Sequence, residues 1–137
     1  MNPKFAQAAD PVFLYAFDLL DRIGRNERTV PEQERLKLHG HLDVMENAIE
    51  AKADGELARY AITCWIDEVL CLDAEWANRE WWQSNTLEWE RFNTMDRHER
   101  FYLRARDSAS LRQKDALEVF YVCVVLGLFF YRRFRYR

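Results

Sequence analysis

Apolar side chains recur every three or four residues along most of this chain, which is the spacing of an α-helix. One such segment starts at Asp10, which stands as a capping residue before Pro11, and it ends near Gly24. A second segment, Pro31–Ala53, ends at the break formed by Asp54–Gly55. The first half of the chain is therefore predicted to be helical.

The second half begins less regularly and then returns to the helical spacing. Asp73–Phe92 holds four tryptophans among acids and amides, and it predicts short helices or irregular turns. A short helix is expected to start at Asp96. Ser110 and Gln113 form a capping-box pattern, which predicts the start of a last helix that runs through Phe129.

The segment Ala58–Leu72 is apolar on nearly every face, which predicts a helix buried among several neighbours. It nevertheless carries two adjacent carboxylates, Asp67 and Glu68, and Glu68 falls on the apolar face that Cys64 also occupies. Burying a carboxylate is costly unless it is paired, hydrogen-bonded or protonated. Two interpretations follow: internal cations satisfy the pair, or the pair lines a groove.

These patterns predict an all-α fold with six to seven helices in a single domain, 1–137, with the third and the last helix at its centre. Composition supports this prediction, since 49% of the residues are hydrophobic and the chain has only 4 glycines and 3 prolines. The net charge of −3 argues against a general nucleic-acid binder, which is usually basic.

The three cysteines and the apolar stretches bear on where the protein works. Cys64 and Cys71 lie two helical turns apart, too far for a disulfide, so reduced cysteines of a cytosolic protein are expected. The first ten residues are polar and do not resemble a signal peptide. The apolar run Val119–Tyr131 is shorter than the roughly 20 residues that span a bilayer, so the chain as given is expected to be soluble.

Catalytic and metal-binding patterns are scarce. His39 and His41 are two residues apart and would diverge on a helix, so no metal site is predicted. Glycine-rich phosphate loops and nucleophile elbows are absent from the sequence. Asp67 and Glu68 also diverge on a helix and are poorly placed as a facing acid and base. We expect neither enzyme activity nor a cofactor.

The chain ends in a basic and aromatic segment that contains Arg132, Arg133, Arg135 and Arg137. These arginines could complement the end of the last helix, or one could fold back to neutralise Asp67 or Glu68. Attraction to anionic lipid or to nucleic acid is a third interpretation. The three interpretations remain open from the residues alone.

Tyr60–Leu70, which reads Tyr-Ala-Ile-Thr-Cys-Trp-Ile-Asp-Glu-Val-Leu, resembles the signature helix of the DotU/IcmH family, whose type VI secretion member is called TssL. Glu99–Tyr102 resembles a second family element, and Leu117–Gly127 resembles the family's Leu-Glu-x-Tyr-Tyr helix. The resemblance extends over nearly the whole chain. It departs from the family pattern at His98, a customary glycine, and after Gly127, where a second glycine is absent.

The resemblance implies an all-helical, hook-shaped domain made of two small bundles, on the cytoplasmic face of the bacterial inner membrane. A C-terminal transmembrane anchor, missing from this chain, would hold it there, and the terminal arginines would flank that anchor. The implied partners are an IcmF/TssM-type inner-membrane protein and a TssK-type baseplate protein, with a homodimer possible. The family's acidic pair corresponds to Asp67 and Glu68, near the cleft between the bundles, and would bind partners.

The expected function is that of a non-enzymatic assembly component of a type VI secretion membrane complex. The alternative is a small helical adaptor that binds anionic lipid or nucleic acid through the arginines and aromatics of its C-terminus.

Overall fold

The structure is a computed structural model of the chain, and it describes residues 1–127. The basic segment with Arg132, Arg133, Arg135 and Arg137 lies outside the described residues. Every regular element among these residues is a helix, which confirms the predicted all-α class. The elements, in chain order, are α1 (Pro3–Gly24), α2 (Pro31–Ala48), α3 (Lys52–Glu68), η1 (Val69–Asp73, a π-helical turn), α4 (Arg79–Ser84), α5 (Leu87–Phe92), α6 (Arg97–Ala109) and α7 (Asp115–Val125).

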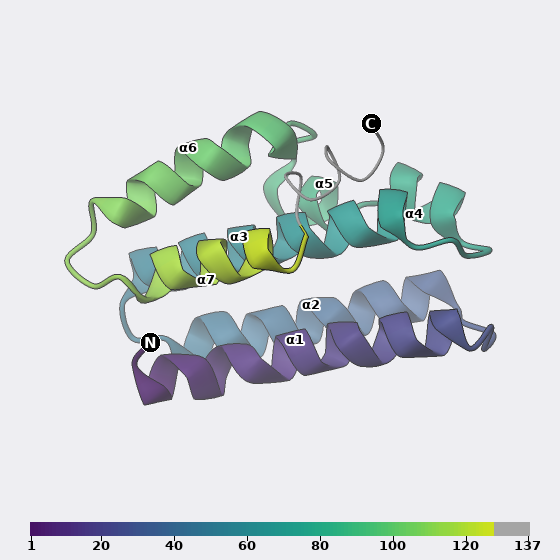
Figure 1. Cartoon of the computed structure of the whole chain (residues 1–137), viewed down its shortest axis with the longest axis horizontal. Coiled ribbons are helices and arrows are strands. Elements are labelled where there is room, and N and C mark those ends of the chain that lie inside the picture. Colours follow the sequence, from purple (N-terminus) through teal and green to yellow (C-terminus); the bar gives the residue numbers. More distant parts are fainter. Residues whose placement is uncertain (128–137) are drawn as a thin grey trace.

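The helices are stacked in tiers around α3 (Figure 1). The hairpin of α1 and α2 lies along one side of α3, and α7 runs beside α3. The helix α6 crosses on the other side, with the short helices α4 and α5 near the end of α3. Every residue from Ala58 to Glu68 is buried, as the uniformly apolar pattern predicts.

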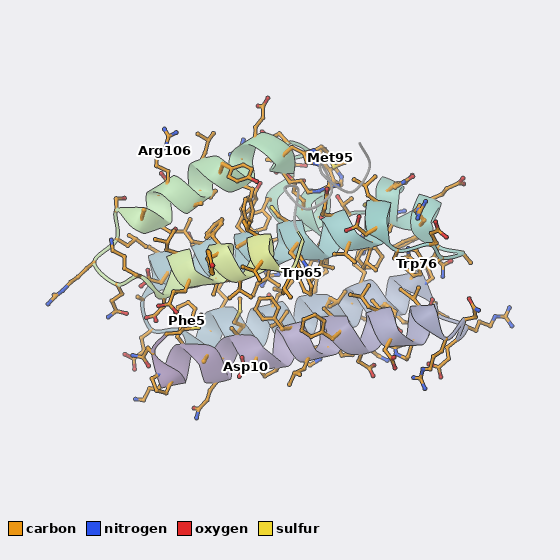
Figure 2. The ribbon with its side chains drawn as sticks, in the orientation of Figure 1. Phe5, Asp10, Trp65, Trp76, Met95 and Arg106 are labelled. Carbon is orange, nitrogen blue, oxygen red and sulfur yellow. The ribbon has the colours of Figure 1, made fainter. Side chains whose placement is uncertain are left out.

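Trp65 fills the contact between α3 and α1. Its ring centroid lies 5.4 Å from that of Phe13 and 5.5 Å from that of Phe17. Figure 2 shows Trp65 between the tier of α3 and α7 and the tier of α1 and α2. Packed aromatic pairs of this kind contribute about 0.5–1.5 kcal/mol each beyond the burial of their area. They tie the α1–α2 hairpin to α3.

The predicted start of the first helix at Asp10 is wrong, because α1 begins at Pro3. The Asn2 side chain caps it by accepting a hydrogen bond from the Lys4 backbone N–H at 2.9 Å. Pro11 lies inside the helix, although a proline there removes one backbone hydrogen bond. The buried stripe that includes Phe5 and Val12 continues on both sides of Pro11. Packing of this stripe therefore outweighs the helix-start pattern of Asp10–Pro11.

The break between the second and third helices also differs from the prediction. α2 ends at Ala48 and α3 begins at Lys52, so Asp54 and Gly55 belong to the first turn of α3. A Cβ atom on Gly55 would lie 3.3 Å from the backbone oxygen of Glu46. The glycine therefore allows the start of α3 to approach the end of α2 closely.

The last helix starts later and ends earlier than predicted. Ser110 does not cap its start, because Ser110 closes α6 and donates its hydroxyl to the Asp107 backbone oxygen at 2.7 Å. α7 begins at Asp115 and ends at Val125. Gly127 follows with a φ of 105°, a backbone conformation that suits glycine at a helix end.

None of the helices in residues 1–127 has the length and the apolar character that a bilayer span requires.

Candidate functional site

Asp67 is fully enclosed and acts as an acceptor for three donors. The indole N–H of Trp82 and the backbone N–H of Leu87 both donate to its Oδ1, each at 2.9 Å. The backbone N–H of Glu88 donates to Oδ2 at 2.8 Å. Its side chain is 0% exposed, so these groups take the place of water around the carboxylate.

Whereas Asp67 contacts α4 and α5, the Glu68 side chain contacts α6. Its Oε1 lies 3.3 Å from an Arg97 guanidinium nitrogen and 3.1 Å from Nε2 of His98. Glu68 is 2% exposed, whereas the His98 side chain is 60% exposed. His98 therefore connects an interior carboxylate with the molecular surface.

A third buried carboxylate, Glu88, joins the two. Its Oε2 accepts hydrogen bonds from the Thr94 hydroxyl at 2.8 Å and from the Asp96 backbone N–H at 3.2 Å, and its Oε1 lies 4.0 Å from Arg97. We call this group the acid–arginine cluster; its members are Asp67, Glu68, Glu88, Arg97 and His98. It lies where α3 meets α5 and α6.

The charges of the acid–arginine cluster are set by burial and by one another. Burial raises the pKa of Asp67 to about 6, although its hydrogen bonds with Glu88, Trp82 and Leu87 act in the opposite direction. Burial also raises the pKa of Glu88. For Arg97, burial alone would lower the pKa, but the surrounding carboxylates outweigh it and the pKa is raised. Arg97 therefore stays charged among its acidic neighbours.

This geometry answers one of the open questions about the acidic pair. Internal groups satisfy both carboxylates: a helix start and an indole for Asp67, and Arg97 with His98 for Glu68. Both carboxylates are buried among the described residues, whereas His98 reaches the surface. The binding of a partner by Asp67 and Glu68 stays a prediction.

The sequence-based interpretation missed the groups that surround the pair. Arg97 and His98 are 29 and 30 residues from Glu68, and no periodic pattern connects positions so far apart. Trp82 is 15 residues from Asp67 and stands in the segment that reads as irregular. Trp82 is itself buried, with Trp76 and Trp81 at ring-centroid distances of 6.1 Å and 5.8 Å.

The cysteines are placed for packing and not for nucleophilic chemistry. Cys64, Cys71 and Cys123 are buried with free thiols. Burial raises the pKa of all three thiols, that of Cys71 to about 12. A thiol held in its neutral form is a weak nucleophile. Among residues 1–127, no three histidine, cysteine, aspartate or glutamate side chains gather as they would around a metal ion.

A protein-family match covers nearly the whole of α1 to α7. The family described as type VI secretion system protein DotU matches residues 4–130. No curated protein and no solved structure matches the chain significantly. The matched range includes the complete acid–arginine cluster and runs from the start of α1 past the end of α7. The chain therefore belongs to the DotU family of type VI secretion system proteins.

Proposed function

We propose that this protein, as a component of a type VI secretion system, acts in assembly and not in catalysis. It would hold partners together on the cytoplasmic face of the bacterial inner membrane. The partners are an IcmF/TssM-type inner-membrane protein and a TssK-type baseplate protein. A C-terminal transmembrane segment would anchor it, with Arg132, Arg133, Arg135 and Arg137 at the membrane surface.

The single observation that carries this proposal is the contact between buried Glu68 and exposed His98. An internal carboxylate 3.1 Å from Nε2 holds the imidazole in one orientation while most of the ring faces outward. A preorganised side chain loses less conformational freedom when a partner binds it. Glu68 thus serves docking through His98, the residue that it orients.

The segment around His98 also exposes apolar side chains of the kind that protein interfaces use. Trp89 is 52% exposed and Met95 56% exposed, and Tyr102 on α6 is 48% exposed. Aromatic residues and methionine are enriched at such interfaces. Met95 stands at the α5–α6 connection in Figure 2, close to the start of the helix that carries His98.

We call the segment from Trp89 to Tyr102 the docking segment, and the acid–arginine cluster makes it rigid. Asp67 fixes the start of α5, and Arg97 with Glu68 fixes the start of α6. Both short elements are therefore tied to α3, the most enclosed helix of the described chain. We expect the docking segment to bind partners with little rearrangement.

The test is a binding measurement with a TssK-type baseplate protein. His98→Ala should weaken binding by about tenfold, as expected for a contact that contributes about 1.4 kcal/mol, while the melting temperature stays close to that of the wild type. Gln33→Ala, an exposed position on α2, is the matched control and should change neither quantity. Unchanged affinity in both His98→Ala and Glu68→Gln would exclude the proposed docking role.

A further inference from the structure

A pocket lies at the opposite end of α3 from the acid–arginine cluster. It has a volume of about 420 Å³ and lies between the start of α1, the α2–α3 connection and the α6–α7 connection. In Figure 1 these segments meet at the end of the molecule marked by the N-terminus. Phe5 and Ile49 form apolar parts of its lining, and Asp54 and Asp115 form acidic parts.

One oxygen atom of the Asp54 side chain in this pocket lacks a hydrogen-bond partner among residues 1–127. Asp54 is 5% exposed, and its Oδ1 is enclosed without any hydrogen-bond donor among the described residues. It forms no ion pair within the same residues, although Lys4 also lines the pocket. A buried carboxylate without a partner is unfavourable for folding, and native proteins rarely keep one.

The neighbouring acidic group makes the burial of the Asp54 carboxylate less favourable still. Burial raises the pKa of Asp54, and the negative charge of Asp115 raises it further. Asp115 is itself 8% exposed, and its Oδ1 accepts a hydrogen bond from the Asn2 backbone N–H at 2.8 Å. The pocket therefore concentrates negative charge that the described part of the chain leaves unpaired at Asp54.

We propose that this pocket receives a lysine or arginine side chain from a partner protein. The aliphatic part of such a side chain would lie against Phe5 and Ile49, and its cationic end would reach Asp54. A hydrogen-bonded cation would provide the missing partner, and pairing with a charged group is among the stronger polar contacts. The site is independent of His98 and adds a second contact point to the assembly.

A basic side chain fits the pocket better than a metal ion does. Asp54, Asp115 and Glu50 line it beside apolar walls, but within residues 1–127 no three acidic, histidine or cysteine side chains gather closely enough to hold a metal ion. A metal ion would prefer a shell of oxygen atoms without apolar neighbours. The apolar lining matches the methylene groups of lysine and arginine.

The test is an NMR titration of the full chain, labelled with ¹⁵N, with short capped peptides. Acetyl-Gly-Arg-Gly-amide and acetyl-Gly-Lys-Gly-amide should shift the amide signals of Asp54, Ile49 and Gln113 in a saturable way. Acetyl-Gly-Gln-Gly-amide, which lacks the charge, should not. Equal shifts with the glutamine peptide would overturn the proposal.

Asp54→Asn separates binding from folding. This variant should bind the basic peptides at least about tenfold more weakly, because a charge-assisted contact is lost. Its melting temperature should equal or exceed that of the wild type, since an unpaired buried charge is removed. Glu32→Gln, an exposed site on α2, controls for the change in net charge and should bind normally. Unchanged peptide affinity in Asp54→Asn, or a lower melting temperature, would assign Asp54 a structural role instead.

Discussion

The Oδ2 atom of Asp67 lies 2.8 Å from the backbone nitrogen of Glu88, although 21 residues separate them. The same carboxylate accepts the Leu87 N–H, while Thr86 accepts the Trp89 N–H at 3.1 Å. The first three N–H groups of a helix have no partner within it, so α5 receives one cap from its own sequence and two from α3. Asp67 therefore determines where a short helix begins.

Replacing Asp67 by alanine should destabilise the protein strongly. The change leaves the Leu87 and Glu88 backbone N–H groups and the Trp82 indole N–H without an acceptor in a buried place. Each unsatisfied buried donor costs about 1–3 kcal/mol, so a loss of about 3 kcal/mol or more is expected in the free energy of unfolding. Urea titration followed by circular dichroism measures it.

The matched control removes an aspartate from the surface. Asp21→Ala breaks an exposed ion pair with Arg25, whose atoms lie 3.2 Å apart, and it should cost less than about 1 kcal/mol. Similar unfolding midpoints for the two variants would show that Asp67 does not cap α5 in solution.

The burial of α3 could be predicted from the sequence, whereas the surroundings of its acidic pair could not. Apolar residues on every face require a helix with neighbours on every side, and Ala58–Glu68 is buried as expected. The contacts of Asp67 and Glu68 depend on which later helix folds over them. Arg97 and Trp82 contact the pair only through the tertiary structure, and the spacing of residues in the sequence does not predict these contacts.

The helix boundaries show how tertiary packing overrides local signals. Asp10 before Pro11 is a favourable helix start, yet the buried stripe of α1 extends on both sides of it. The same holds for Ser110, whose hydroxyl caps the end of α6 and not the start of α7. Capping residues satisfy backbone groups at either end of a helix, so their presence alone does not say which end.

Pro11→Ala should stabilise the protein. The proline is exposed on α1, so little packing is lost, and alanine restores the hydrogen bond from residue 11 to the Gln7 carbonyl. We expect a gain of about 1–3 kcal/mol in the free energy of unfolding, reduced somewhat by the greater freedom of the unfolded chain. Thermal unfolding measures the gain, with the exposed Gln7→Ala as the control. A lower melting temperature would indicate that Pro11 shapes a bend that α1 needs.

The three cysteines should be unreactive in the native protein. All are buried, and their raised pKa values keep the thiols protonated at pH 8. Ellman's reagent should therefore modify none of them in native buffer and all three in 6 M urea, with native reaction rates limited by unfolding. Rapid reaction of one cysteine without denaturant would contradict the described burial.

Asp67 should also give the protein a specific dependence of stability on pH. Its carboxyl has a pKa of about 6 in the folded protein and the ordinary value of 3.8 when unfolded. Between these values the folded state keeps a proton that the unfolded state has lost, so the free energy of unfolding falls as pH rises from about 4 to 6. Above pH 6 this contribution is constant. The total change is of the order of 3 kcal/mol.

Other carboxyls also change the stability over this pH range. The pKa of Glu34, for example, is lowered by hydrogen bonds to Arg22 and Tyr15 against the effect of its burial. Comparing the wild type with Asp67→Asn isolates the contribution of Asp67. The variant keeps the shape of the side chain but cannot ionise. The free energy of unfolding of both proteins is measured with urea at half-unit steps from pH 4 to 7. Below pH 6, that of the wild type should fall more steeply with rising pH than that of Asp67→Asn, and above pH 6 the two plots should run parallel. Plots that stay parallel from pH 4 to 7 would mean that Asp67 is ionised in the folded protein throughout, held so by the three donors that cap α5 and bind its oxygens.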